Sequence, residues 1–233
     1  MTSTPFCAIV PAGGSGQRMG RDTPKQYLPL AGATVLEWAL APLLAAGGLQ
    51  RLVVAVPAGD TRFAELPCAA DERVRTVTGG ATRADSVAAG LAALTDLDDT
   101  LPVAVHDAAR PCLTVDDLER LLAVAHEPAG ALLAVAVSDT LKRASAVGEV
   151  EETVDRNALW QALTPQAFPL ATLRRALVAR DPADAGITDE ASAVERLGLA
   201  PRLIAGDPAN IKVTQPGHLV LAEAILAARG GPS

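Results

Sequence analysis

The sequence is poor in aromatic residues and in cysteine. Phe, Trp and Tyr make up only 3% of its 233 residues while 49% are apolar, so a buried core must be built mainly from Ala, Val and Leu. The three cysteines, Cys7, Cys68 and Cys112, are odd in number and form no CxxC pair. This usage argues against a disulfide framework and against a zinc site of the usual spacing. We therefore expect a reducing compartment.

Long apolar runs and positive charge are also scarce. No stretch approaches the roughly 18 apolar residues that span a bilayer, and residues 1–5 lack the charged start of a secretory signal. The 20 Lys and Arg are outnumbered by 27 Asp and Glu, which gives a net charge of −7. An acidic protein repels the phosphates of nucleic acid, although one basic pocket can still bind a nucleotide. We expect a cytoplasmic protein that binds neither membranes nor nucleic acid.

Apolar strand signals alternate with helix signals along the chain. Short apolar runs at 6–10, 51–56 and 102–106 are typical of buried strands, and capped or amphipathic segments separate them. This alternation predicts an α/β fold, with a mostly parallel sheet covered by helices on both faces. The length suits one such domain, and no repeat or linker divides it, so residues 1–233 are expected to form a single domain.

The remaining elements are predicted from caps and periodicity. Thr34 and Glu37 form a capping-box pattern, and Thr82 with Asp85 repeats it. Further strands are expected at 73–77, 131–137, 202–205 and 210–214, a helical turn at 61–66, and further helices at 114–127, 169–179 and 189–197.

A glycine-rich loop with three cations follows the first expected strand. It reads PAGGSGQRMG and leads to PKQYLPL, which places Arg18, Arg21 and Lys25 among the glycines. Glycines let backbone N–H groups approach a phosphate closely, and the cations supply opposite charge. The loop matches neither GxxxxGK[ST], GxGxxG nor GxSxG, which disfavours a P-loop enzyme, an NAD-dependent oxidoreductase and a nucleophile elbow. We expect a long loop over a nucleotide, with Lys25 at its far end.

Two later strand ends carry further polar residues. Gly80 precedes a helix start that bears Arg83 and Ser86, and Asp107 follows the strand at 102–106. Ligands of open α/β sheets bind at the carboxyl ends of strands, where a carboxylate can meet a metal ion or a hydroxyl. Ordinary helix capping and a turn-forming Asp remain open as structural explanations.

The glycine loop, together with the segments GGATRADSV, VHDAARP, TVDRNALWQALTPQ, ITDEAS and NIKVT, resembles the 2-C-methyl-D-erythritol 4-phosphate cytidylyltransferases. The resemblance runs from residue 9 to about residue 214. It implies a Rossmann-like nucleotidyltransferase fold (GT-A-like) and transfer of a cytidylyl group from CTP to 2-C-methyl-D-erythritol 4-phosphate. The reaction would require Mg²⁺ and would belong to the non-mevalonate route to isoprenoid precursors.

The resemblance also implies roles for individual residues. Arg18 and Lys25 would stabilise the reacting α-phosphate of CTP, and Arg156 and Lys212 would hold the incoming phosphate in line. Asp107 would lie near Mg²⁺, which the triphosphate oxygens would mainly hold. The expected substrate-binding residues are Ala12, Gly13, Gly14, Ser15, Gly80, Ala81, Arg83, Ser86, Asp107, Arg110, Thr140, Thr164 and Thr188.

Residues 138–157 are mainly polar, unlike the apolar run at 131–137 before them. Their pattern predicts a polar hairpin that cannot bury much of its own surface. The resemblance implies that this hairpin is a protruding arm that interlocks with a second subunit. Thr140 and Arg156 would then contribute to the neighbour's site in a homodimer. Trp160 is expected to be an anchor in the core or in the dimer contact.

Several of these residues also have plainer interpretations. Lys212 could be a solvated edge charge, and Thr188 is first of all an N-cap candidate. His106 is expected to be a packed strand residue, and Arg110 is expected at the rim of the site. Gly217 and His218 replace the acidic pair that usually follows NIKVT, which leaves the charge of the last helix open.

Two other functions remain open at this point. One is the same transfer to ribitol 5-phosphate, which uses a closely similar loop. The other is a catalytically silent nucleotide-binding module. The presence of both Arg18 and Lys25, with Asp107 and Lys212, argues against the silent module, because a sensor has no need of cations at a reacting phosphorus.

Overall fold

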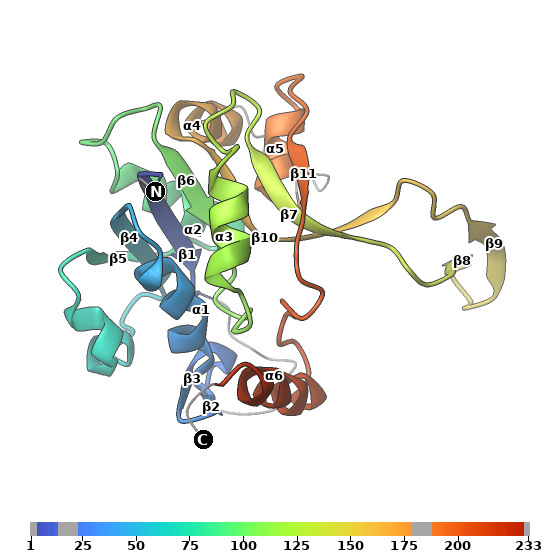
Figure 1. Ribbon diagram of the computed structural model, residues 1–233, viewed down its shortest axis with the longest axis horizontal. Coiled ribbons are helices and arrows are strands. Elements are labelled where there is room, and N and C mark those ends of the chain that lie inside the picture. Colours follow the sequence, from blue (N-terminus) through green and yellow to red (C-terminus); the bar gives the residue numbers. More distant parts are fainter. Residues whose placement is uncertain (1–3, 14–22, 179–187, 231–233) are drawn as a thin grey trace.

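Seven strands form one mixed sheet through the middle of the molecule (Figure 1). The computed structural model describes residues 4–13, 23–178 and 188–230. The strand order is β11-β7-β10-β6-β1-β4-β5. All neighbours in this sheet run parallel except β10, which is antiparallel to both β6 and β7. The strands are β1 (Phe6–Pro11), β4 (Leu49–Val56), β5 (Val74–Thr78), β6 (Pro102–Val105), β7 (Ala131–Ala136), β10 (Trp160–Pro169) and β11 (Arg202–Ala205).

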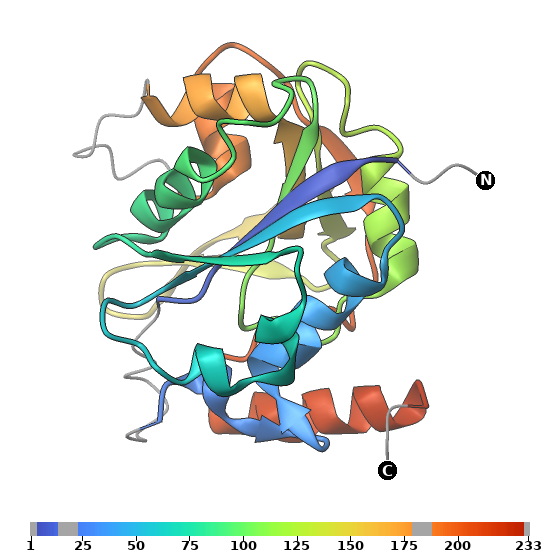
Figure 2. The ribbon, with the colours of Figure 1, turned by 90° about the vertical axis from the view of Figure 1, so that its left-hand side faces the viewer.

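Helices cover both faces of this sheet, as the alternating pattern predicted (Figure 2). The helices α1 (Val35–Ala45) and α3 (Val115–Leu122) pack on one face. The other face is covered by α2 (Arg83–Ala92), α4 (Leu170–Val178) and α5 (Glu190–Glu195). The last helix, α6 (Pro216–Ala228), lies beside the small hairpin of β2 (Pro29–Leu30) and β3 (Ala33–Thr34). The predicted α/β fold is therefore confirmed.

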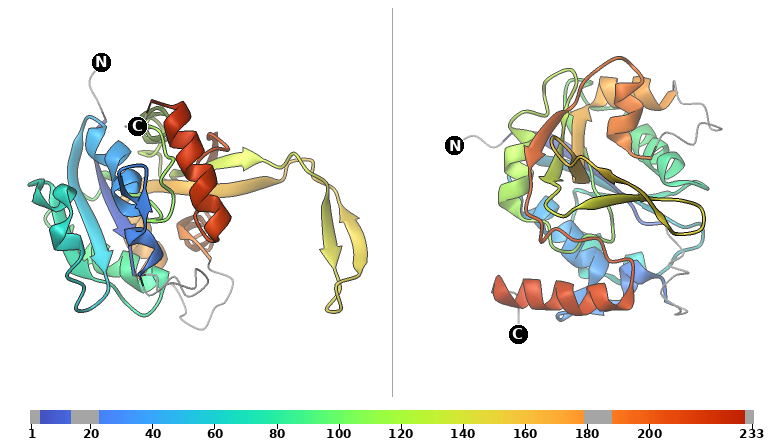
Figure 3. Two further views of the ribbon diagram at one scale, coloured as in Figure 1. Left: turned by 90° about the horizontal axis from the view of Figure 1, so that it is seen from below. Right: turned by 90° about the vertical axis from the view of Figure 1, so that its right-hand side faces the viewer.

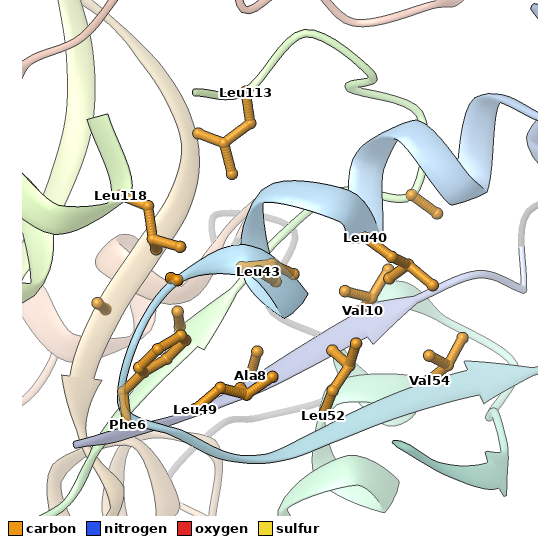
Figure 4. Packing of buried hydrophobic residues seen from close by; sticks show 14 of the residues in the cluster. Phe6, Ala8, Val10, Leu40, Leu43, Leu49, Leu52, Val54, Leu113 and Leu118 are labelled. Atoms are coloured by element: carbon orange, nitrogen blue, oxygen red, sulfur yellow. The ribbon is translucent and has the colours of Figure 1, made fainter. Parts of the chain in front are cut away.

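The two faces of β1 show how the core is divided. Phe6, Ala8 and Val10 point to the α1 face, whereas Cys7 and Ile9 point to the α2 face. This follows from the two-residue period of a strand. Figure 4 shows the first three side chains beside the apolar residues of the neighbouring strand β4, on the face of the sheet that α1 covers.

The predicted caps form where the sequence placed them. The Thr34 side chain accepts the Glu37 N–H and Thr82 accepts the Asp85 N–H, each as part of a complete capping box. Thr114 likewise caps α3, although that helix ends at Leu122 rather than at residue 127.

Two strand predictions need correction. Residues 210–214 form no strand, because their backbone turns towards the 107–110 segment, where the Val213 N–H donates to the Ala109 carbonyl (2.7 Å). Instead β10, which was not predicted, fills the gap between β6 and β7. Its Pro165 would normally argue against a central strand. It is accommodated because the pairing with β7 shifts register between Ala162 and Gln166.

A two-stranded arm projects from the sheet between β7 and β10 (Figure 3). Its strands, β8 (Leu141–Ala144) and β9 (Val150–Val154), pair antiparallel. Every residue from 138 to 157 is exposed except Ser145 and Val154, which are half-buried. The expected polar hairpin is thus present and has little contact with its own chain.

Within the described ranges, no helix is long and apolar enough to cross a lipid bilayer.

Candidate active site

A pocket with a volume of about 520 Å³ opens at the carboxyl ends of β1 and β6 and at the start of α2. This volume is typical of small-molecule sites. The chain leaves β1 towards β4 on one side and returns to β6 on the other, so the pocket lies at a switch point of the sheet. Its lining residues are Pro11, Ala12, Gly13, Lys25, Gln26, Gly80, Ala81, Thr82, Arg83, Ser86, Asp107, Ala108, Ala109 and Lys212.

The structure brings together nine of the residues that the sequence predicted for the site. They come from five separate segments of the chain, which meet around the carboxyl ends of β1 and β6. The nine are Ala12, Gly13, Lys25, Gly80, Ala81, Arg83, Ser86, Asp107 and Lys212.

Lys25 is held at the pocket from two sides. It begins a short 3-10 turn (Lys25–Tyr27), and the buried Gln26 amide donates to the Ala12 carbonyl (2.6 Å), which ties this turn to the end of β1. The Lys25 ammonium donates to the Val213 carbonyl (3.3 Å) next to Lys212. The two pocket lysines are therefore carried by segments that touch each other.

Ser86 shapes the backbone opposite these lysines. Its hydroxyl accepts the Gly80 N–H (3.2 Å) and donates to the Thr82 carbonyl (3.0 Å). A Cβ at Gly80 would overlap the Cβ of Asp85, so only glycine fits this turn. Ser86 lines the pocket as predicted, but its hydroxyl is used to hold the turn in place.

Asp107 is the centre of a cluster of charges. Its Oδ1 accepts from Arg83 Nε (3.0 Å), while its Oδ2 meets Lys212 Nζ at 2.8 Å and Arg110 Nε at 3.5 Å. Burial alone would raise the pKa of Asp107, but the three cations outweigh burial and hold that pKa far below its usual range. The carboxylate is therefore ionised at neutral pH and orders the cations around it.

Glu190, which the sequence did not single out, completes this cluster. Its side chain is only 2% exposed and receives both terminal nitrogens of Arg83 (2.5 and 3.0 Å). Burial raises the pKa of Glu190, and the Arg83 guanidinium opposes that shift. In the sequence, Glu190 resembles any acid in the first turn of a helix, and its partner lies 107 residues away. Nothing local could have revealed the pair.

His106 and Thr164 support Asp107 from beneath the pocket. The Thr164 hydroxyl accepts the Asp107 N–H (3.0 Å) and lies 3.0 Å from His106 Nδ1, while His106 Nε2 lies 3.1 Å from the Arg110 carbonyl. Burial lowers the pKa of His106 to about 4, so its ring is neutral at pH 7. Only Nε2 then carries a proton, which it donates to that carbonyl, and Nδ1 accepts from Thr164. His106 is a packed residue, as expected, and Thr164 supports the site without lining it.

Arg110 does not lie at the rim, contrary to expectation. It is 8% exposed and donates to the Asn210 carbonyl (2.7 Å) behind the pocket. Its position follows from the tight turn in which the Arg110 N–H donates to the Asp107 carbonyl. Arg110 therefore contributes charge to Asp107 rather than a surface to a ligand.

Three other predicted residues lie outside the pocket of their own chain. Thr140 and Arg156 are exposed on the arm, where Arg156 donates to the Ser138 carbonyl. Thr188 is also exposed, and it is not the N-cap of α5, because the Asp189 side chain caps that helix instead. Gly14, Ser15 and Arg18 belong to the part of the glycine loop that lies outside the described residues.

The described residues of the pocket offer one carboxylate for a metal ion. Among the described residues, no three His, Cys, Asp or Glu side chains gather as a metal-binding group. Asp107 is the single carboxylate among the described residues that line the pocket. Mg²⁺ is usually held by one or two carboxylates together with phosphate oxygens of the substrate. The donor set therefore fits a Mg²⁺ ion that arrives with a triphosphate, and it does not fit a cage built by the protein alone.

Comparison with known proteins shows which family the chain is similar to. The family model for 2-C-methyl-D-erythritol 4-phosphate cytidylyltransferase matches residues 6–228. A protein of that name from Klebsiella pneumoniae subsp. pneumoniae is 52% identical over 219 residues, which cover 93% of this chain and 92% of the relative. Another, from Pseudomonas fluorescens, is 52% identical over 218 residues, 92% of each chain.

Solved structures show the same likeness. The crystal structure of a 4-diphosphocytidyl-2C-methyl-D-erythritol synthase matches with a TM-score of 0.82 at 40% identity, covering 96% of this chain and 100% of that one. The 2-C-methyl-D-erythritol 4-phosphate cytidylyltransferase from Thermus thermophilus matches with a TM-score of 0.80 at 32% identity and the same coverage. On sequence and fold together, the chain belongs to the 2-C-methyl-D-erythritol 4-phosphate cytidylyltransferase family of nucleotidyltransferase enzymes.

Proposed function

We propose that this protein transfers the cytidylyl group of CTP to 2-C-methyl-D-erythritol 4-phosphate. The products are 4-diphosphocytidyl-2-C-methyl-D-erythritol and pyrophosphate, in the non-mevalonate route to isoprenoid precursors. The observation that carries the proposal is the convergence of Lys25, Arg83 and Lys212 on one pocket at the switch point of the sheet. Two polyanions can meet only where cations are held in place for both.

The chemistry requires charge and position more than proton transfer. A phosphate monoester is largely a dianion at neutral pH, since its second pKa is about 6, so it attacks without a general base. Its oxygen forms a bond to the α-phosphorus of CTP while the bond to the bridging oxygen breaks and pyrophosphate leaves. Catalysis then consists of alignment and of neutralising the charge on the phosphoryl oxygens.

Lys25 and Lys212 divide this work between the two substrates. Lys25, which lines the pocket beside the end of β1, would stabilise the α-phosphate, together with Arg18. Lys212, whose side chain is 41% exposed, would hold the acceptor phosphate while its ammonium keeps a bond to Asp107. An ammonium has three N–H donors, so it can serve both partners.

Asp107 is the residue that would hold Mg²⁺ together with triphosphate oxygens. Mg²⁺ supplies positive charge at the phosphate oxygens when it is bound. The base and ribose would lie against the pocket wall formed by Gly13, Gly80 and Ala81, which we call the glycine wall. The hydrogen bonds of the Ser86 hydroxyl with the Gly80 N–H and the Thr82 carbonyl hold this wall in place.

The arm is proposed to complete the site of a second subunit in a homodimer. Support comes from the exposure of Thr140 and Arg156, which find no place in the pocket of their own chain. Lys25→Ala and Arg156→Ala subunits, each inactive alone, would then complement each other. In a statistical mixture of dimers, about a quarter of the sites would be intact. A verified mixed dimer without recovered activity would count against sharing.

The direct test of the function is pyrophosphate release from CTP and Mg²⁺ with 2-C-methyl-D-erythritol 4-phosphate as the acceptor. Ribitol 5-phosphate replaces the acceptor in one control, and ATP, GTP and UTP replace CTP in others. Release that is fastest with CTP and methylerythritol phosphate supports the proposal. Faster release with ribitol 5-phosphate would change the acceptor, and no release with either would leave only nucleotide binding.

A further inference from the structure

We infer that Glu190 is a positioning residue for the acceptor phosphate, and this inference rests on the proposed function. It acts through Arg83 and Asp107 on Lys212, although Glu190 itself does not line the pocket. Glu190 holds Arg83 on one oxygen of Asp107, and this keeps the other oxygen for Lys212.

The division of the Asp107 oxygens is visible in the distances. Arg83 Nε lies 3.0 Å from Oδ1, and Lys212 Nζ lies 2.8 Å from Oδ2. Arg110 Nε is 3.5 Å from Oδ2 and is committed elsewhere through its bond to Asn210. Lys212 is therefore fixed by an oxygen that Arg83 leaves unoccupied.

Glu190 can impose this arrangement because it is itself fixed. The Gln166 amide pins the start of α5 on both sides of Glu190: its oxygen accepts the Ala191 N–H (2.8 Å) and its nitrogen donates to Asp189 (2.7 Å). The Glu190 carboxylate is 2% exposed and binds the guanidinium of Arg83 at two points. If Arg83 turned away, a buried charge would be left unpaired, which is strongly unfavourable.

Without the Glu190 charge, Asp107 is the remaining carboxylate partner of Arg83. A guanidinium fork matches both oxygens of a carboxylate, so Arg83 would take Oδ1 and Oδ2 of Asp107 together. Lys212 would lose its anchor and the acceptor phosphate its fixed donor. The contacts proposed for CTP lie at Lys25 and the glycine wall and would remain.

If only net charge mattered, loss of the Glu190 charge would strengthen the binding of the acceptor phosphate, whereas a positioning role for Glu190 predicts weaker binding. Among the described residues, Arg83, Arg110 and Lys212 form ion pairs with two carboxylates, Asp107 and Glu190. Neutralising Glu190 adds one net positive charge beside the pocket, which by simple attraction would tighten the binding of a phosphate. If Glu190 acts by position, binding weakens instead.

The experiment compares Glu190→Gln with Glu195→Gln, an exposed acid on the same helix. We expect Glu190→Gln to raise the KM for methylerythritol phosphate by about 10- to 100-fold, the equivalent of one charge-assisted hydrogen bond. The KM for CTP should change by less than about twofold, and Glu195→Gln should match the wild type. An unchanged or lower acceptor KM overturns the inference, and so does an equal rise for both substrates.

A second set of variants covers the case in which Glu190→Gln fails to fold. Arg83→Gln with Glu190→Gln removes both charges of the pair, so that the buried Glu190 charge is not left without its partner, and this is better tolerated than removing one charge. If Glu190 acts through Arg83, the double variant should show the same acceptor KM as Arg83→Gln alone. A further rise in the double variant would overturn the inference. If the wild type releases no pyrophosphate, the proposed function is overturned as well. If the wild type turns over normally and the Glu190 variants do not behave as expected, the positioning role of Glu190 alone is overturned.

Discussion

Two ion pairs of the same kind sit in very different places in this molecule. Arg83 and Glu190 meet under the pocket, where the side chains are 29% and 2% exposed. Arg143 and Glu152 meet at 2.6 Å across the arm, where they are 62% and 54% exposed. The first pair is held by packing from three separated segments, and the second by a two-stranded ladder alone.

The two pairs differ in how firmly the chain itself holds the charged side chains. The pocket cations lie beside the carboxyl ends of the sheet strands, where contacts from separate segments hold each side chain in place. Residues on the arm have reach but little fixation from their own chain. The comparison predicts large effects for changes in the pocket and small ones for matched changes of arm residues that are not proposed to reach a substrate, such as Lys142 and Arg143.

The largest effect should come from Lys25→Ala. We expect kcat to fall by about 10² to 10³, the usual result of removing one preorganised donor from a developing charge. The assay is pyrophosphate release at saturating CTP and acceptor. The matched control is Lys142→Ala on the arm, where the ammonium donates to Thr153 at an exposed site. Similar losses in both variants would remove the distinction between pocket and arm.

The next effect is the pH dependence of stability at His106. Its folded pKa, about 4, lies below the ordinary 6.5, so the unfolded chain binds a proton before the folded chain does. Stability from this group is therefore lost as pH falls from about 6.5 to 4, by about 3 kcal/mol in total. Urea unfolding at pH 7, 5.5 and 4.5 measures it.

Two other contributions must be separated from His106. The pKa of Glu190 is raised by burial, so its contribution is present at low pH and is lost as pH rises through that pKa, the opposite sign. The pKa of Asp107 is lowered, so its contribution is lost only in stronger acid. Subtracting the profile of His106→Asn leaves the histidine alone. A difference that stays flat between pH 7 and 4.5 would contradict the buried neutral ring.

Much of the fold was predictable because its signals are local. The caps at Thr34 and Thr82 and the apolar run of β1 depend on neighbours within a few residues. By contrast, β10 was not predicted, because Pro165 argues against a central strand. The strand forms nevertheless, because its pairing with β7 is interrupted at that point. Residues 210–214 were predicted as a strand, but the backbone there bonds to the turn after Asp107 instead of to a neighbouring strand.

Site residues that belong to a recognisable motif could be predicted from the sequence. Residues whose role depends on burial against distant segments could not. Lys25, Asp107 and Lys212 were chosen by type and resemblance, and the pocket brings them together. Glu190 became visible only once α5 was placed against Arg83. Arg110 was misplaced for the same reason, because sequence does not tell whether a charge behind a turn faces solvent or protein.

A smaller effect is expected at the cap of α2. Thr82→Ala removes the acceptor for the Asp85 N–H and should cost about 1 kcal/mol of folding free energy. The midpoint of urea unfolding should fall with an unchanged slope. Thr153→Ala, which removes an exposed acceptor on the arm, is the control and should change stability by less than about 0.5 kcal/mol. Equal losses would mean that the arm is as firmly built as the pocket wall.

The smallest effect should come from the arm's own ion pair. Arg143→Gln removes a contact between two exposed side chains, and such pairs contribute about 0 to 1 kcal/mol because solvent screens them and ordering costs entropy. Urea unfolding at several protein concentrations measures the loss, with Arg75→Gln, an exposed arginine of the body, as the reference. A loss well above 1 kcal/mol that grows with protein concentration would mean that a second subunit covers the pair. The arm would then gain from its partner the fixation that the pocket has from its own chain.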